Sequence, residues 1–292
     1  MERKIYMISR EQFRLLTALE KNGPIKADKI TAPSVAELLA GGLLVKQDDL
    51  FEISPSGLKE LEPYQVKRAI IMAAGFGSRM LPATKDTPKP LVEVNGKRII
   101  ETLLDALVAA EIKDITIIVG YQRQQFKSLL ANYPFLKFVT NDDYVNCNNI
   151  SSMMKVLDRL DRGTYICEAD LYVTNPAIIS KYQYDSNILG YYCQETTDWC
   201  FKLQASYVTD YRQGNTDCYN EYGISYWTKE DCAQLRRDLP AIYAQPEGSQ
   251  QFWKAVPLKW CQANYQVCLR ECQKEDIVEI DSYQKLLQIR QK

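Results

Sequence analysis

The chain has no histidine among its 292 residues, and this absence removes several kinds of chemistry at once. Ser-His-Asp and Cys-His catalysis, zinc held by imidazole, and the most common general base of enzymes all require histidine. Any reaction must therefore use carboxylates, cationic side chains and bound metal ions. Phosphoryl and nucleotidyl transfer suit this restriction, because they depend mainly on positioning and on neutralising charge.

Excess charge, long hydrophobic runs and paired cysteine motifs are missing as well. Lys and Arg number 36 and Asp and Glu 37, so the net charge of −1 gives no general attraction to nucleic acid or acidic membranes. No apolar run is long enough to span a bilayer and no signal peptide is recognisable, so we expect a cytoplasmic protein without membrane contacts. The nine cysteines include no CxxC pair, which argues against a disulfide framework.

Residues 1–65 form a candidate first domain. Ser9 and Gln12 have the spacing of a capping box at the start of a helix. We expect further elements in this order: a helix over 34–40, short strands over 43–45 and 50–53, and a short helix from 56. Two helices followed by a small hairpin and a helix resemble a winged helix-turn-helix domain.

Charge argues against DNA binding by this domain. Residues 1–66 contain nine Lys or Arg and ten Asp or Glu, and the candidate recognition segment, 34–40, contains Glu37 and no basic residue. DNA-binding modules are usually basic on the face that reads the duplex. We therefore favour a docking, dimerisation or regulatory role, and nucleic acid binding stays open as the alternative.

From residue 67 to 292 expected strands and helices alternate, which indicates a second domain of the α/β class. Such alternation favours a Rossmann-like, mixed and mostly parallel sheet with helices on both faces and ligands beyond the carboxyl ends of its strands. The expected strands are 69–74, 115–119, 137–140, 165–168, 188–192, 201–208, 222–227 and 278–281, and the expected helices are 97–110, 122–131, 150–157 and a final one.

A glycine-containing loop follows the first strand of this domain. Gly75 and Gly77 allow backbone amides to approach a phosphate closely, and Arg79 and Lys89 add two cations. The loop lacks the Gly-Lys-Ser/Thr of a P-loop, and Met80 stands where a dinucleotide fingerprint needs its third glycine. The glycine loop and the two cations together predict a site that binds a nucleoside triphosphate and transfers part of it.

Two carboxylates end the strand over 165–168. With a period of two, Glu168 and Asp170 face the same side at the carboxyl end of that strand. Mg²⁺ prefers one or two carboxylates together with substrate phosphates, so a metal site fits here. A turn or helix-capping aspartate is the alternative interpretation.

The segment AAGFGSRM…TPKPLVEVNGKRII resembles the signature of nucleotidyltransferases that make sugar nucleotides and CDP-alcohols. Five more segments are similar to the bacterial CTP:phosphocholine cytidylyltransferases: NDDYVNCNNISSMMK from residue 141, EAD from 168, TDW from 197, GISYW from 223 and EIDS from 279. The resemblance covers about residues 67–292.

This resemblance implies Mg²⁺ as cofactor and a set of site residues. It implies catalytic roles for Arg79 and Lys89, and metal binding by Asp170 and Asp281. The implied nucleotide-binding residues are Ala73, Ala74, Gly75, Gly77, Gly120, Tyr121, Asn149 and Ser151. Because the acceptor phosphate is already anionic, no general base is needed.

Aromatic and acidic residues of the later half suit a cationic headgroup, which proteins hold through cation–π attraction and carboxylates. The candidates are Tyr192, Glu195, Asp198, Trp199, Trp227 and Trp253. One position departs from the phosphocholine enzymes, since Lys254 stands where they have an acid, and this would suit a substrate with extra negative charge. The Glu-Lys-Pro segment that typifies sugar-1-phosphate enzymes is absent.

The sequence thus predicts transfer of CMP from CTP to a phosphorylated amino-alcohol, with phosphocholine as first choice. Phosphoethanolamine and 2-aminoethylphosphonate are alternative acceptors. An NDP-sugar synthase and a metabolite-sensing transcription regulator are alternative functions, and a homodimer is left open.

Overall fold

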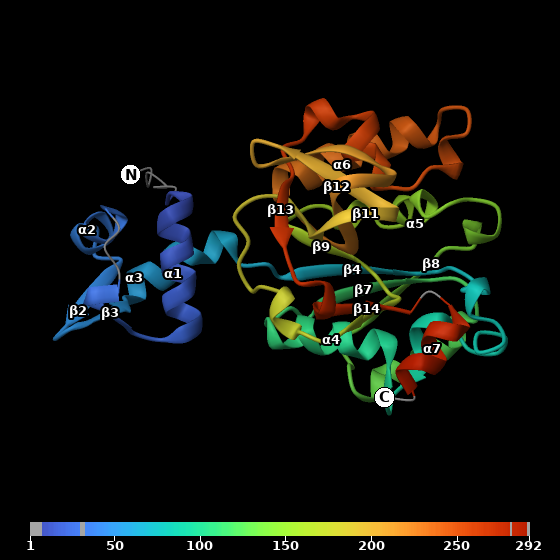
Figure 1. Ribbon diagram of the computed structural model, residues 1–292, viewed down its shortest axis with the longest axis horizontal. Coiled ribbons are helices and arrows are strands. Elements are labelled where there is room, and N and C mark those ends of the chain that lie inside the picture. Colours follow the sequence, from blue (N-terminus) through green and yellow to red (C-terminus); the bar gives the residue numbers. More distant parts are fainter. Residues whose placement is uncertain (1–7, 30–32, 281, 291–292) are drawn as a thin grey trace. The chain divides into compact units, whose positions relative to one another are not determined.

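The computed structural model describes residues 8–29, 33–280 and 282–290. Internal contacts divide the chain into two units, one made of residues up to 65 together with 182–184, and the other of residues 66–181 and 185 onward. Figure 1 labels the larger elements of each unit. Across the described residues, no helix combines the length and the apolar character needed to cross a membrane.

The first unit is a small helical domain with a three-stranded sheet of order β1-β3-β2. The expected capping box is confirmed at the start of its first helix, where Ser9 and Gln12 exchange side chain to backbone hydrogen bonds. The core is built around Leu16, Leu38 and Leu61. Its elements are α1 (Arg10–Asn22), β1 (Ile25–Lys26), α2 (Pro33–Ala40), β2 (Leu44–Gln47), β3 (Leu50–Ile53) and α3 (Pro55–Leu61).

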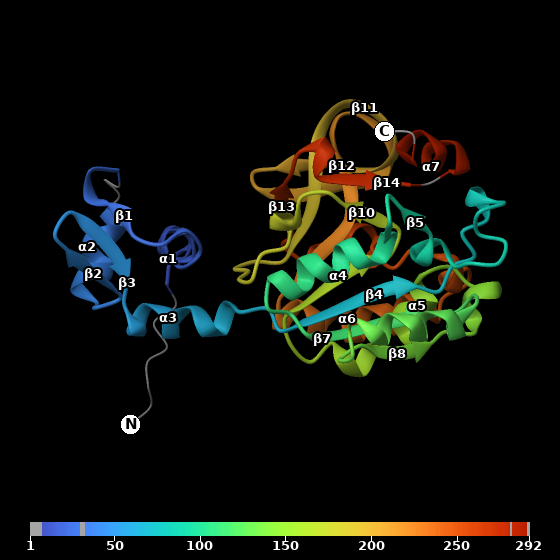
Figure 2. The same cartoon turned by 90° about the horizontal axis from the view of Figure 1, so that it is seen from below.

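The second unit contains a seven-stranded sheet of order β11-β13-β12-β9-β4-β7-β8. Figure 2 shows β4, β7 and β8 side by side. These three strands and β9 are parallel, whereas β12 pairs antiparallel with β9, so the expected mixed and mostly parallel sheet is confirmed. The strands are β4 (Arg68–Ala73), β7 (Asp114–Val119), β8 (Lys137–Thr140), β9 (Thr164–Glu168), β11 (Asn187–Gln204), β12 (Tyr207–Trp227) and β13 (Cys268–Glu271).

Helices cover both faces of this sheet. Strand β4 carries apolar side chains on both of its faces, as a strand buried between two layers requires. Ile71 packs in the cluster that contains α4 (Ile99–Ala109), and Ile70 packs in the cluster that contains α5 (Ile150–Met154) and α6 (Lys229–Tyr243). Figure 1 shows α4 on one side of the sheet and α6 on the other.

Several elements differ from the sequence-based expectation. Strands β11 and β12 form one long hairpin that turns at Ala205, which interrupts the strand expected over 201–208. The expected helix over 122–131 is a 3-10 helix from Arg123 to Ala131. The strand near the C-terminus, β14 (Ile277–Glu279), pairs with β10 (Leu171–Val173) outside the main sheet, and the final helix is α7 (Tyr283–Arg290). A two-stranded ribbon of β5 (Glu93–Val94) and β6 (Lys97–Arg98) leads into α4.

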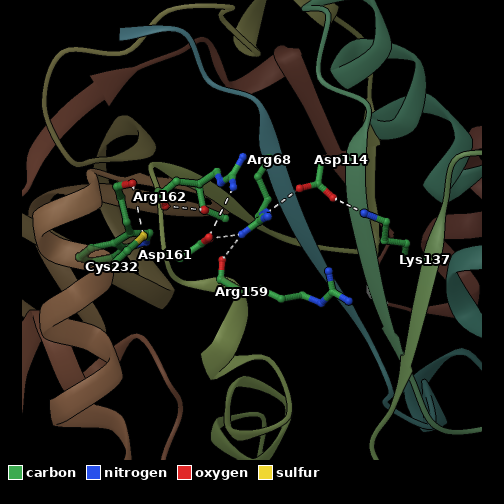
Figure 3. Close-up of polar contacts among 9 residues, drawn as sticks. Arg68, Asp114, Lys137, Arg159, Asp161, Arg162 and Cys232 are labelled. Carbon is green, nitrogen blue, oxygen red and sulfur yellow. Dashed lines mark hydrogen bonds and ion pairs between the residues drawn. The ribbon is translucent and has the colours of Figure 1, made fainter. Parts of the chain in front are cut away.

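A buried guanidinium ties together the amino-terminal ends of the central strands (Figure 3). Arg68 donates through Nε to Asp114 at 2.7 Å and through Nη1 to the carbonyl of Arg159 at 2.7 Å, and it also pairs with Asp161. Asp114 also accepts from Lys137 at 2.8 Å. The amino-terminal ends of these strands are therefore fixed by ion pairs, and a ligand site can form only at their carboxyl ends.

Candidate active site

A cavity of about 660 Å³ lies at the carboxyl ends of the central strands. The sheet order places β8 and β7 on one side of β4, and β9 and β12 on the other. Loops after β4 and β8 and residues at the end of β9 line the cavity, as expected for ligands of open α/β sheets. The cavity therefore has a β8 side, a centre at the glycine loop and a β9–β12 side.

The centre of the cavity is the glycine loop after β4. Gly77 has φ +62°, and a Cβ at this residue would lie 2.8 Å from Cβ of Lys89. Both the left-handed conformation and the close approach exclude a side chain here. Thr84 donates to the Gly77 carbonyl at 2.9 Å. The loop is thus held directly against Lys89.

Lys89 and Asp170 form an ion pair within the cavity. Nζ of Lys89 lies 2.8 Å from Oδ2 of Asp170, and Lys89 is 8% exposed. Burial alone would raise the pKa of Asp170, but the adjacent Lys89 ammonium brings it below its usual range. The carboxylate therefore stays ionised next to the glycine loop, where a phosphate or a cation can meet it.

Gly120 and Tyr121 support the loop from behind, and neither lines the cavity in the described part of the chain. The Tyr121 amide donates to the Ala74 carbonyl at 3.1 Å, and Gly120 lies directly against Ala74 and the ring of Tyr144. Phe76 of the loop packs against both tyrosine rings, with centroids 5.4 Å and 4.9 Å away. These two predicted nucleotide-binding residues thus position the loop.

The β8 side of the cavity carries a buried polar network. Asn141, which follows β8, is fully buried and donates to the hydroxyls of Ser151 and Ser152, at 3.0 Å each. Oδ1 of Asn149 accepts from the backbone amide of Trp253 at 2.9 Å. All three polar side chains of residues 149–152 therefore have fixed orientations where they face the cavity.

The β9–β12 side contains a buried ammonium between two carboxylates. Lys254, 4% exposed, lies 2.9 Å from Oε1 of Glu168 and also pairs with Glu221, which accepts from the Tyr211 hydroxyl at 2.7 Å. Burial alone would lower the pKa of Lys254, but the two carboxylates raise it overall. A Cβ at Gly223 would lie 2.7 Å from Cβ of Glu168, so this glycine makes room for the carboxylate.

The aromatic residues that line this side are only partly those expected. Trp199 stacks on Tyr211 at 4.9 Å and meets Phe252 edge-on at 5.2 Å, and all three line the cavity. Trp227 and Trp253 are fully buried in the core and pack against each other at 5.8 Å. Of the three predicted cage tryptophans, therefore, only Trp199 lines the cavity. Trp227 and Trp253 instead stabilise the core next to it.

The remaining predicted headgroup residues lie on β11. Asp198 lines the cavity, whereas Tyr192 and Glu195 are exposed and do not contribute to its described lining. The Tyr192 hydroxyl donates to Asp217 at 3.1 Å, on the outer part of the hairpin. Of the three predicted residues on β11, only Asp198 thus contributes to the cavity.

Comparison with known proteins identifies the group to which this site belongs. A family model described as nucleotidyl transferase matches residues 68–153. The chain is 38% identical to the 2-aminoethylphosphonate cytidylyltransferase of Lancefieldella rimae over 221 residues, which are 75% of this chain and 89% of that protein. The chain belongs to the cytidylyltransferases of the nucleotidyl transferase family.

Two further similarities agree with this placement. The choline-phosphate cytidylyltransferase of Streptococcus pneumoniae is 31% identical over 230 residues, which are 76% of this chain and 97% of that protein. The solved structure of CTP:phosphocholine cytidylyltransferase from the same species aligns with a TM-score of 0.71 and 30% identity, and the alignment covers 78% of this chain and 98% of that one. The fold of the second unit is thus the family fold.

The cavity of this cytidylyltransferase is rich in carboxylates. Glu279 at the end of β14 lines it beside Asp198, and neither forms an ion pair with a residue that the structure describes. Burial and the nearby carboxylates, Asp170 first among them, raise the pKa of Glu279 to about 8. Such crowding of negative charge favours binding of a cation.

Of the two predicted metal ligands, the structure describes Asp170, whereas Asp281 lies outside the described residues. Among the residues that are described, no three acidic or cysteine side chains converge closely enough to enclose a metal ion. Asp170 faces the cavity beside the glycine loop, and one or two carboxylates with substrate phosphates are the usual Mg²⁺ environment. The oxygen donors present therefore fit Mg²⁺ bound jointly with a nucleotide.

The structure brings most of the predicted site together. The predicted residues that line the cavity are Ala73, Ala74, Gly75, Gly77, Arg79, Lys89, Asn149, Ser151, Asp170, Asp198 and Trp199. Other lining residues were not in the predicted set: Asn141, Tyr144, Ser152, Tyr211, Glu221, Phe252, Lys254 and Glu279. Of these, Asn141 directly follows an expected strand, a position that in an α/β sheet signals the ligand edge.

Proposed function

We propose that this enzyme transfers CMP from CTP to a small acceptor that carries an ammonium group at one end and a phosphonate or phosphate at the other. Its preferred acceptor is 2-aminoethylphosphonate. The observation that carries the proposal is one cavity that joins the glycine loop and the Lys89–Asp170 pair to a carboxylate-rich end. The first part suits a nucleoside triphosphate, and the second suits an ammonium group.

The proposed reaction needs no general base. An anionic phosphonate oxygen attacks the α-phosphorus of CTP, a new P–O bond forms, and the bond to the β-phosphate breaks to release pyrophosphate. Lys89 lies between the loop and Asp170, where it would stabilise the negative charge that builds up on the α-phosphate. Arg79, exposed at the mouth of the same loop, would neutralise the departing pyrophosphate.

Mg²⁺ is the proposed cofactor, held by Asp170 and Asp281. Bound there, it would neutralise charge on the reacting phosphates, as in other phosphoryl transfers. The ionised Asp170 beside the glycine loop and the crowded carboxylates of the cavity support this assignment.

The space on the β9–β12 side of the cavity, called the ammonium end because the acceptor's ammonium group would bind there, favours a primary amine over a trimethylammonium group. The Lys254 side chain already occupies part of this end, between Glu168 and Glu221. Asp198 and Glu279 remain to bind a cation, and a primary ammonium donates three hydrogen bonds that carboxylates accept. Trimethylammonium is larger and donates none, so it gains less from this site. The 38% identity to a 2-aminoethylphosphonate enzyme points the same way.

Pyrophosphate release in the presence of CTP and Mg²⁺ tests the proposal, with 2-aminoethylphosphonate, phosphoethanolamine, phosphocholine and glucose-1-phosphate assayed in parallel. We expect the highest kcat/KM with 2-aminoethylphosphonate and a value at least about tenfold lower with phosphocholine, since one poorly fitted polar group costs about 1–3 kcal/mol. Equal or better use of phosphocholine would refute the assigned acceptor. Release with glucose-1-phosphate alone would indicate an NDP-sugar synthase.

The Lys254→Ala variant tests the physical reason for this preference. Removing the side chain opens the ammonium end and frees two carboxylates, so the ratio of kcat/KM for phosphocholine to that for 2-aminoethylphosphonate should rise at least several-fold. Lys259→Ala is the matched control, because Lys259 is a neighbouring lysine outside the lining of this cavity. An unchanged acceptor ratio in the Lys254 variant would show that this side chain does not set the preference.

A further inference from the structure

We infer that Thr196 is a positioning residue, which aims Asp198 at the acceptor's ammonium group and is itself held by the buried side chain of Asn220. Asp198 is exposed at the cavity wall, and its carboxylate forms no ion pair with a residue in the described part of the chain. The inference rests on the proposed function, since it assumes that Asp198 faces the ammonium group. It adds the residues that fix the position of this carboxylate.

Asp198 lies in a β-bulge of the β11–β12 hairpin. The register of the two strands shifts between Thr196 and Trp199, where two residues of β11 lie opposite Gly214 alone. Gly214 has φ +72°, in the left-handed region that favours glycine. A bulge disrupts the ladder locally and can aim a side chain in a new direction. Asp198 can therefore face the cavity, but the bulge alone does not fix its direction.

The Thr196 side chain closes this bulge. Its Oγ1 accepts from the backbone amide of Asp198 at 3.1 Å. A bond from a threonine oxygen to the amide two residues later forms a local turn, which takes the place of a ladder hydrogen bond. Because this turn spans the bulge, the backbone of Asp198 follows the position of the Thr196 hydroxyl.

The Asn220 amide fixes the orientation of the Thr196 hydroxyl. Asn220 is 2% exposed, its Nδ2 donates to the Glu221 carbonyl at 3.2 Å, and its Oδ1 accepts from Oγ1 of Thr196 at 2.6 Å. A flipped amide would turn its oxygen toward the Glu221 carbonyl, so that two acceptors would meet in a buried place. Thr196 therefore donates to Asn220, and its lone pairs are left for the Asp198 amide.

The other flank of Asp198 is fixed from the same part of β12. Trp199 stacks on Tyr211 at 4.9 Å, and the Tyr211 hydroxyl donates to Glu221 at 2.7 Å. Two successive residues, Asn220 and Glu221, thus hold the segments on both sides of Asp198. If these contacts only stabilised the hairpin, losing one would affect every acceptor alike. If they position Asp198, the loss affects acceptors that carry an ammonium group.

The test compares 2-aminoethylphosphonate with ethylphosphonate, which differs from it only by lacking the amino group. For both acceptors, kcat/KM is measured with saturating CTP in the full-length wild type and in Thr196→Val, Thr196→Ala and Thr196→Ser. We expect the preference for the amino compound to fall at least about fivefold in the Val and Ala variants, because a misplaced carboxylate loses much of a charged hydrogen bond. The Ser variant keeps the hydroxyl, so its preference should stay within about twofold of wild type.

The split between kinetic constants and a matched control sharpen this test. In Thr196→Val the KM for 2-aminoethylphosphonate should rise, while the KM for CTP stays within about twofold of wild type, as for a substitution remote from the nucleotide. Thr209→Val is the control, because Thr209 lies on the same hairpin and donates to the Lys202 carbonyl at 3.3 Å, but is outside the described lining of this cavity. It should leave the acceptor preference within about twofold of wild type.

The outcomes separate this inference from the proposed function. A wild type that uses neither acceptor, or both equally well, would contradict the proposed function and the inference with it. A wild type that prefers 2-aminoethylphosphonate, with the same preference in Thr196→Val and Thr196→Ala, would overturn the inference alone. An equal loss of preference in Thr196→Ser or Thr209→Val would also overturn it, because it would indicate a general effect on the hairpin.

Discussion

Lys89 is the residue on which the proposed chemistry depends most. It is buried against the glycine loop and paired with Asp170. Lys89→Ala should lower kcat by about 10²–10³-fold, the usual loss when one group that stabilises transition-state charge is removed. The measurement is steady-state pyrophosphate release, with urea unfolding recorded on the same sample to exclude a folding defect.

Lys137 provides the control for this substitution. It also pairs with an aspartate, at 2.8 Å from Asp114, but it lies at the amino-terminal end of its strand, away from the cavity, and is half exposed. Lys137→Ala should leave kcat within about twofold of wild type. If Lys89→Ala reduced kcat by less than about threefold, the role assigned to Lys89 would be wrong.

At the residue scale, the sequence predicted the site residues that belong to a local motif. It was less successful for residues whose place in the cavity or the core depends on packing between distant segments. The glycine loop and Asp170 lie together as their positions after strand ends predict, and Lys89 of the same motif lies against both. Trp227 and Trp253 could not be assigned in this way, because core and cavity tryptophans look alike in a sequence. The role of Lys254 depends on Glu221, more than thirty residues away, and no local pattern joins the two.

At the scale of elements, the Arg68 contacts in Figure 3 hold together the amino-terminal ends of the central strands, opposite the end where the cavity lies. They join β4 to β7 through Asp114 and to the segment before β9 through Asp161. Arg68→Ala removes a buried guanidinium and leaves the partly buried Asp114 with Lys137 as its remaining partner, so it should lower the free energy of unfolding by about 3 kcal/mol. Asp161→Asn should cost less than about 1 kcal/mol, because Asp161 is 45% exposed. Equal losses in urea unfolding would contradict this account.

The same contacts predict a dependence of stability on pH. Burial alone would raise the pKa of Asp114, but hydrogen bonds from Lys137 and Arg68 lower it below its usual value. The stability that Asp114 contributes is therefore complete above the ordinary carboxyl pKa of about 3.9 and is lost as pH falls through the lowered folded-state pKa. In Arg68→Ala, acid unfolding followed by circular dichroism should begin at a higher pH than in wild type.

Element boundaries followed the hydrophobic pattern for the central strands and failed for the hairpin. Strand β4 begins and ends within one residue of its expected bounds, because an unbroken apolar run marks a strand buried on both faces. In β11 and β12, polar residues extend far along both strands, and their pairing with each other, including several register shifts, decides where they end. Such pairing is not encoded in either segment alone.

At the scale of the whole molecule, the first unit has no role in the proposed reaction, because the residues that line the cavity all belong to the second unit. Its order of elements and its three-stranded sheet support the proposal of a winged-helix-like domain. The face of a recognition helix would come from α2, which contains Glu37 and no basic residue, and the β2–β3 turn contains Asp48 and Asp49. We therefore propose a docking or regulatory role for this unit.

A gel-shift experiment tests this interpretation against the alternative of a transcription regulator. The full-length protein should not retard mixed-sequence duplex DNA or its own upstream region at micromolar concentration and 50 mM salt, where basic DNA-binding modules bind even without sequence preference. Retardation of the upstream fragment alone, released by CTP or by an acceptor, would establish a sensing function in addition to catalysis.

The central claim is that one cavity joins CTP to an aminoalkyl phosphonate, and ³¹P NMR of the complete reaction tests it most directly. With CTP, Mg²⁺ and 2-aminoethylphosphonate, the account predicts a new pair of coupled phosphonate and phosphate signals, together with one equivalent of pyrophosphate. An unchanged phosphonate signal, while CTP is consumed with phosphocholine or a sugar phosphate in its place, would contradict the account.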